Sequence, residues 1–173
     1  MPVALAAAAL FAAASPGAPQ GPDVAQLLRD ACVTTELQRT AFERMARERR
    51  WREARTTSTY GLQGGWSLFF HADGAVVMLS YVPEVAADEP STGTVCTVSV
   101  ERATPQLEAE IGSLAEELGL EAEQPFTGPQ IGAASMQTWS RLGYRTLTYA
   151  VIPNGRATIS LSRQLVVHGP GQE

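Results

Sequence analysis

Thr94-Val-Cys-Thr-Val-Ser-Val-Glu101 is the stretch that decides the fold. Its residues alternate, so that Cys96, Val98 and Val100 fall on one side and small or polar residues fall on the other. This alternation is typical of a half-buried strand, because successive side chains of a strand point to opposite faces of the sheet. The stretch therefore predicts an antiparallel sheet with one covered face, and it places Cys96 on that face.

The other cysteine, Cys32, lies on the apolar side of a predicted helix. Asp23 can cap this helix, and Leu27 and Ala31 share its apolar face with Cys32. A disulfide from Cys32 to Cys96 would close a long loop and would be worth about 4 kcal/mol in the chain-entropy model. We predict this disulfide, which would tie the helix to the sheet. Two separate buried thiols are the alternative.

An apolar, alanine-rich run opens the chain and ends near Ala14. It is too short to span a bilayer, but it has the length of the central part of a secretion signal. Ala12-Ala13-Ala14 matches the small-residue pattern of a cleavage site, although no Arg or Lys precedes the run. A disordered alanine-rich tail is the alternative. We predict a periplasmic or secreted protein, because an oxidising compartment also permits the disulfide.

The domain organisation follows from these boundaries. Residues 1–22 are predicted to be a signal peptide and flexible spacer, residues 23–166 a single α+β domain, and residues 167–173 a frayed tail. At this size the central part can bury a core of its own.

Within the domain, the patterns predict the order helix, three strands, helix, three strands. After the helix that contains Cys32, a capping box of Thr35 and Gln38 predicts a new helix, or a restart, from Glu36 to about Arg50. The next helix begins at Thr104-Pro105 and ends before Gly119. Strands are expected over 66–70, 75–82, 94–101, 134–142, 144–152 and 156–163, with hairpin turns at Asp73-Gly74 and Asn154-Gly155. The predicted fold is a two-layer α+β domain, an antiparallel sheet of about six strands with helices on one face.

This combination resembles a small family of secreted proteobacterial proteins, some of which are similar to the TATA-binding-protein-like (TBP-like) α+β fold. The residues that carry the resemblance are Cys32, Cys96, Leu114, Leu118, Gly119 and Trp139. The resemblance spans most of the mature chain and implies the fold and export. It implies no activity and transfers no catalytic residue. The arginine-rich segment before Trp51 is a departure from it.

Composition and motifs argue against several functions. The net charge is -5 and the pI is near 5.1, which argues against nucleic-acid binding. We expect no metal and no cofactor, since the two histidines, His71 and His168, form no ligand pair. Ser67 and His71 stand four residues apart on one predicted strand, about 13 Å by rise alone, so they do not predict a catalytic pair. We therefore assign no catalytic residue.

Basic residues cluster between Arg39 and Arg55, diluted by glutamates. One interpretation is a surface for an anionic partner, such as lipid headgroups or an acidic protein. The other, which we favour, is a helix surface with ion pairs four residues apart, for example Glu43 with Arg47 and Glu48 with Arg52.

The uncovered face of the sheet is the candidate binding surface. Counting by twos places small hydroxyls there, and Trp139 and Arg141 would stand among them if their strand presents them on that side. Aromatic residues and arginines are frequent at interfaces. The candidate binding residues are Gln137, Trp139, Arg141, Thr148 and Ser160. The alternative is an ordinary wet sheet face, with Trp139 in the core.

The sequence thus favours an exported, non-enzymatic binding module without a transmembrane segment. Its partner would be an envelope or periplasmic component or a small ligand, which the sequence does not identify. The alternative is a small hydrolase-like enzyme, which a pocket bringing His71 near a carboxylate, with perturbed pKa values, would favour. A third hypothesis is a homodimer that forms through exposed strands.

Overall fold

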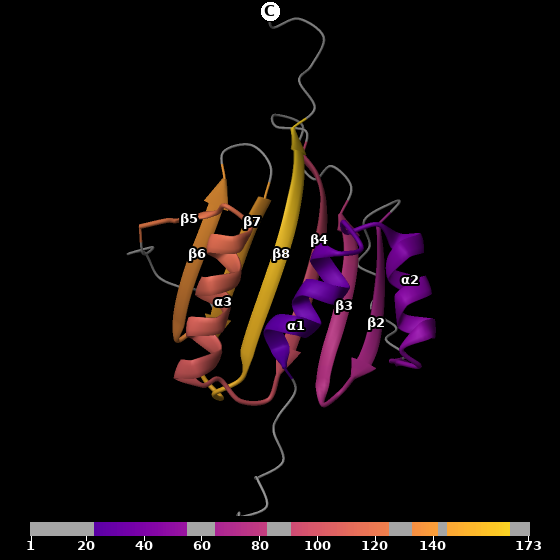
Figure 1. Ribbon diagram of the computed structural model, residues 1–173, viewed down its shortest axis with the longest axis horizontal. Helices are drawn as coiled ribbons and strands as arrows, with labels where there is room; N and C mark the ends of the chain where they lie inside the picture. The colour runs from indigo at the N-terminus through magenta and orange to yellow at the C-terminus, as the bar shows by residue number, and fades with distance from the viewer. Residues whose placement is uncertain (1–22, 55–64, 83–90, 125–132, 142–144, 167–173) are drawn as a thin grey trace, which may run out of the picture.

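The computed structural model describes residues 23–54, 65–82, 91–124, 133–141 and 145–166. The predicted signal peptide and spacer, 1–22, and the predicted tail, 167–173, lie outside these residues. The described residues form α-helices, one π-helical turn and a single antiparallel sheet of 8 strands (Figure 1). The predicted α+β class is confirmed.

The bounds of the helical elements are α1 Val24–Leu28, the π-helical turn η1 Arg29–Val33, α2 Arg39–Glu48 and α3 Pro105–Glu117. Helices α1 and α3 begin where the sequence supplies caps. The carboxylate of Asp23 accepts a hydrogen bond from the backbone N–H of Gln26 at 2.9 Å, as the sequence predicts. Thr104 caps α3 by accepting from the backbone N–H of Leu107 at 3.1 Å.

The predicted capping box of Thr35 and Gln38 is wrong. In η1 the backbone N–H of Thr34 bonds to the carbonyl of Arg29 at 2.9 Å, the wider spacing of a π-helix. The hydroxyl of Thr35 then donates back to the carbonyl of Ala31 and cannot cap the next helix. Consequently α2 starts at Arg39 without a side-chain cap.

The strands nearly match the predicted ranges, but two were missed. The bounds are β1 Arg52–Glu53, β2 Trp66–Ala72, β3 Ala75–Val82, β4 Ser91–Val100, β5 Glu121–Ala122, β6 Ser135–Arg141, β7 Arg145–Val151 and β8 Ala157–Val166. The expected count of about six is corrected to 8, because β1 and β5 also pair. Each has only 2 residues, too few to show a periodic pattern.

The sheet consists of two halves that meet at its centre. Its strand order is β1-β2-β3-β4-β8-β7-β6-β5, so each half runs from a short outer strand to a long inner one. The inner strands β4 and β8 pair from Ser91 opposite Val166 to Val100 opposite Ala157. In the chain, a helix precedes each half, α2 before β1 and α3 before β5.

Both predicted hairpin turns are confirmed. Asp73 and Gly74, between β2 and β3, have φ values of 48° and 84°. Two successive positive values are the signature of a type I′ turn, whose twist matches that of the flanking strands. Gly155 has a φ of 80° in the hairpin between β7 and β8, where the backbone N–H of Ile152 bonds to the carbonyl of Arg156.

Helices α1 and α3 lie across one face of the sheet, with α1 over β4 and α3 over β6 and β7 (Figure 1). We call this the covered face. Helix α2 packs on the same face near β2, where Phe42 makes an edge contact with Phe70. The core between helices and sheet includes Leu28, Val77, Leu79, Val98, Ile111, Leu114, Leu147, Ile159 and Leu161.

The predicted disulfide crosses this core. Cys32 in η1 is bonded to Cys96 in β4, and both residues are completely buried. The bridge therefore ties the helix layer to a central strand of the sheet, as the sequence predicts.

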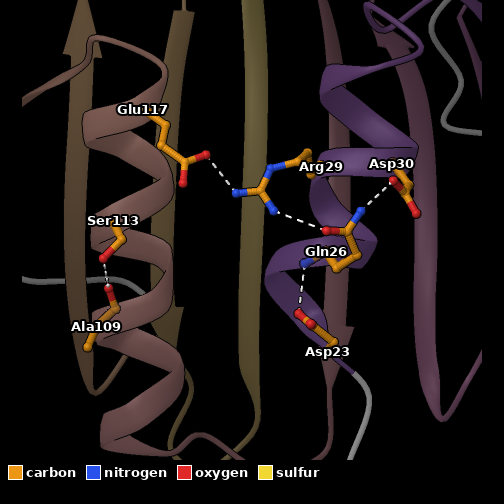
Figure 2. Close-up of polar contacts among 7 residues, drawn as sticks. All are labelled: Asp23, Gln26, Arg29, Asp30, Ala109, Ser113 and Glu117. Atoms are coloured by element: carbon orange, nitrogen blue, oxygen red, sulfur yellow. Dashed lines mark hydrogen bonds and ion pairs between the residues drawn. The ribbon is translucent and has the colours of Figure 1, made fainter.

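A chain of polar contacts joins the three helices on the outer side. Arg29 donates to Glu117 of α3 at 2.7 Å and to Gln26 of α1 at 3.2 Å (Figure 2). Gln26 in turn donates to Asp30 at 2.7 Å, and Asp30 also pairs with Arg49, just after α2. The contacts are solvent-exposed, so each contributes about 1 kcal/mol or less.

Candidate functional site

The sheet face opposite the helices carries rows of small hydroxyl side chains. Successive strand pairs from β2 to β6 align the residues into one row of Ser67, Ser80, Val95, Ser162, Thr146 and Ser140. The next row consists of Phe69, Met78, Thr97, Ser160, Thr148 and Thr138. A further row consists of His71, Val76, Ser99, Thr158, Ala150 and Met136. We call these positions the open face, since no helix among the described residues lies over them.

Hydroxyls of neighbouring strands hydrogen-bond to one another on this face. The hydroxyl oxygens of Ser67 and Ser80 are 2.8 Å apart, and those of Thr97 and Ser160 are 3.1 Å apart. These pairs satisfy part of the polar surface without water, and Ser80 and Thr97 are buried among their neighbours. Thr148, which lies opposite Ser160, stays half-buried.

Apolar side chains interrupt the hydroxyls near the β2 side of the open face. Phe69 and Met78 are directly opposite one another, and Val76 and Val95 lie on the adjoining rows. All four are half-buried. At the row positions from β2 to β6 no residue is Asp, Glu, Lys or Arg. The centre of this face can therefore lose its water without removing a charge from solvent.

The predicted binding residues do not share one face. Thr148 and Ser160 are on the open face, as expected. Trp139 instead lies opposite Leu147, and Gln137 lies opposite Tyr149, which are core positions of the covered face. The same alternation places Arg141 on the covered side, so the expectation that Trp139 and Arg141 stand among the hydroxyls is corrected.

The surroundings of Trp139 explain this placement. Trp139 belongs to the hydrophobic core, and its ring packs against α3, where a Cβ at Gly112 would be 3.8 Å from Trp139 Cζ2. Gln137 is held by local bonds, its side-chain amide donating to the carbonyl of Thr138 at 3.2 Å. Strand β6 carries polar residues on both faces, so its own sequence did not reveal which face is buried.

The arginine-rich segment is only partly a surface of helical ion pairs. Glu43 pairs with Arg39 at 2.9 Å and not with the predicted Arg47. The predicted pair of Glu48 with Arg52 is wrong, because α2 ends at Glu48 and Arg52 belongs to β1. Arg55 lies outside the described residues.

Several of these arginines instead line a groove at one end of the sheet. The groove has a volume of about 620 Å³. It is lined by the turn after α2, the β2–β3 hairpin, the end of β4 and the start of β8, with Arg49, Arg50, Arg52, His71, Asp73, Ser99, Glu101 and Arg156 among its residues. The sequence did not reveal the groove, because Arg156, in the β7–β8 hairpin, lies about a hundred positions along the chain from the other arginines.

The groove brings His71 to the same cavity as two carboxylates, which bears on the enzyme alternative. Among the described residues, neither Asp73 nor Glu101 forms an ion pair or side-chain hydrogen bond with His71. Ser67 also does not contact His71, since its hydroxyl faces Ser80. Among the described residues His71 thus shares a cavity with two carboxylates but makes no side-chain hydrogen bond or ion pair with either.

The described residues contain neither a cluster of metal ligands nor a helix that could span a membrane. Within the described ranges, no group of three or more His, Cys, Asp or Glu residues could hold a metal ion. His168 lies outside these ranges. None of the helices described is long and apolar enough to cross a membrane.

Comparison with known proteins adds no assignment. No family model, no curated protein and no solved structure matches the chain. The functional argument therefore depends on the geometry of this chain alone.

Proposed function

We propose that this chain is an exported, non-enzymatic binding module that uses the open face of its sheet to bind a partner outside the cytosol. The observation that carries the proposal is the uncharged centre of that face, where half-buried apolar side chains lie among small hydroxyls. Of the residues predicted from sequence, Thr148 and Ser160 remain in the proposed site. Trp139, Arg141 and Gln137 do not.

The apolar residues distinguish a binding surface from an ordinary wet face. Ser and Thr alone are expected on any solvated strand, because they suit the pleated geometry. Phe69 and Met78 instead indicate a binding surface. Aromatic residues and Met are enriched at protein interfaces, whereas charged residues are depleted in interface cores. The partner that fits is an uncharged, moderately apolar surface of an envelope or periplasmic component.

Export is the second part of the proposal, and the disulfide supports it. Cystine bridges persist in oxidising compartments and are rare in the cytosol. The apolar run before Ala14 would supply the signal. We also infer that the fold is a two-layer, TBP-like one, and the meeting of the two halves at β4 and β8 supports this inference.

Site-specific photocrosslinking in cells that naturally make the protein tests the binding face. A photoreactive residue at Thr148 should give adducts, whereas the same residue at Ser113, exposed on α3, should not. Replacing Phe69 with Arg should abolish the adducts from Thr148, because the charge would have to be desolvated in the interface. Adducts of equal yield from Ser113, or their persistence in Phe69→Arg, would contradict the proposed face.

Cell fractionation tests export. The full-length chain should be found outside the cytosol, shortened at the N-terminus and oxidised at Cys32 and Cys96. A variant with Leu5→Arg and Leu10→Arg, which breaks the apolar run, should stay uncleaved inside the cell. An unshortened wild-type chain in the cytosol, with both thiols reduced, would refute export.

A further inference from the structure

We propose that the groove at the end of the sheet, defined by Arg50, Arg52, His71, Asp73 and Arg156, binds a small organic phosphate. The groove shares His71, Val76 and Ser99 with one row of the open face, but the proposal does not depend on the partner-binding function. The groove has a volume of about 620 Å³, which is within the range of small-molecule sites, roughly 300–1,000 Å³.

The charge of the groove is opposite to that of the protein. Arg49, Arg50, Arg52 and Arg156 all line it, against the carboxylates of Asp73 and Glu101. The whole chain has a net charge of -5. The concentration of arginines at one concave site is therefore a local feature that general charge does not explain, and a concave cationic site attracts anions.

Most of these arginines are available to a ligand. Arg49 is engaged, because it pairs with Asp30. Arg50, Arg52 and Arg156 are exposed, and no carboxylate of a described residue forms an ion pair with any of them. Positive charges that line one groove repel one another, and a bound oxyanion would relieve that repulsion.

The types of side chain indicate the chemical class of the ligand. Arginine presents a planar fork of donors that matches the oxygens of phosphate, and several arginines suit a group with more than one negative charge. Asp73, Glu101 and Ser99 lie in the same groove and can accept hydrogen bonds from hydroxyl groups. A phosphate ester that also carries hydroxyl groups can bind the arginines through its phosphate and the acceptors Asp73, Glu101 and Ser99 through its hydroxyls.

The test uses glycerol 3-phosphate as the probe, titrated into the intact protein by calorimetry at about 0.15 M salt. We expect a dissociation constant of about 1 mM or lower. The double variant Arg52→Gln/Arg156→Gln should bind at least about tenfold more weakly, because two charge-assisted contacts are lost. The affinity of the double variant Arg52→Lys/Arg156→Lys should fall between those of the wild type and the glutamine variant, since lysine keeps the charge but lacks the planar fork of donors.

The matched control is Arg141→Gln/Arg163→Gln. It removes the same charge from two exposed arginines outside the groove, and it should leave binding unchanged. Thermal unfolding of each variant verifies that it is folded. Equal affinity in wild type and Arg52→Gln/Arg156→Gln would overturn the proposal, as would an equal loss in the control.

A second arm identifies the source of the phosphate. Sedimentation with phosphatidylglycerol vesicles, compared with phosphatidylcholine vesicles, tests a lipid headgroup in place of the free ester. Binding of either probe that depends on Arg52 and Arg156 supports phosphate recognition and assigns its source. If the wild-type protein binds neither glycerol 3-phosphate at about 10 mM nor the anionic vesicles, the groove is not a phosphate site.

Discussion

The Cα atoms of Cys32 and Cys96 lie 5.6 Å apart although 64 positions separate the two residues in the chain. The distance is in the range that a disulfide requires, and both residues are fully buried. The bridge thus fixes η1, the π-helical turn that follows α1, onto β4, the inner strand of the first half of the sheet.

Removing the disulfide should greatly destabilise the fold. The variant Cys32→Ala/Cys96→Ala should lose about 4 kcal/mol of unfolding free energy, because the unfolded chain regains the freedom of a long loop. Urea denaturation measures the loss. Wild-type protein unfolded with a reductant is the control and should match the double variant to within about 1 kcal/mol. Equal stability of the oxidised and reduced proteins would contradict the role of the bridge.

Trp139 should behave as a core residue and not as a surface anchor. Its side chain is only 9% exposed, so Trp139→Ala should cost about 3–5 kcal/mol through lost contacts and a residual cavity. Thr148→Ala, on the open face, should cost less than about 1 kcal/mol. Urea denaturation of the two variants gives the comparison. Similar stabilities would show that the ring is not packed as described.

Gly112→Ala should stabilise the protein by about 1 kcal/mol. Gly112 is in the interior of α3, where glycine is less favourable than alanine by about that amount. The added Cβ would be 3.8 Å from Trp139 Cζ2, an ordinary van der Waals distance. Gly119→Ala is the control and should destabilise, because Gly119 has a φ of 66°. Thermal denaturation of both variants should show shifts of opposite sign.

Tyr149 should make the protein less stable at alkaline pH. Burial raises the pKa of Tyr149 above its ordinary value of 10.0, and the negative charge of Glu108 raises it further. The fold thus favours the neutral phenol, and this contribution is fully present below pH 10.0 and is lost as the pH rises through the higher pKa of the folded state.

The variant Tyr149→Phe should therefore show a shallower fall of unfolding free energy above pH 10.0 than the wild type. Urea denaturation over a series of alkaline pH values measures the slope. Tyr81→Phe, which changes a tyrosine at a different site in β3, is the matched control. Indistinguishable slopes for Tyr149→Phe and wild type would argue against a shifted Tyr149.

The polar chain across the helices should contribute little to stability. Arg29 and Glu117 are 36% and 60% exposed, so Arg29→Gln should cost less than about 1 kcal/mol. The neighbouring Leu28→Ala should cost about 2–5 kcal/mol, since Leu28 is completely buried. Chemical denaturation of both variants compares the two effects. A larger loss in Arg29→Gln would mean that the ion pair orients the helices.

The strand that follows a clear turn signal was predicted best. Ala75–Val82 was predicted with its bounds, because Asp73-Gly74 marks the hairpin turn before it. The alternating stretch 94–101 identified β4, but the strand begins earlier, at Ser91. The two-residue strands β1 and β5 were missed, since pairing with a neighbour, and not their own residues, makes them strands. The groove was missed for the same reason, because only tertiary packing places Arg52 and Arg156 in one cavity.

The sequence by itself determined the α+β class, the helix caps at Asp23 and Thr104, both hairpin turns and the pairing of the cysteines. These depend on local periodicity, on turn residues and on the small number of cysteines. Only the tertiary structure decided the face of Trp139, because β6 is polar on both sides and its orientation follows from the strand it pairs with. It also decided which arginines line the groove, since Arg156 comes from the β7–β8 hairpin and the others from the segment after α2, and only folding brings these two segments to one end of the sheet.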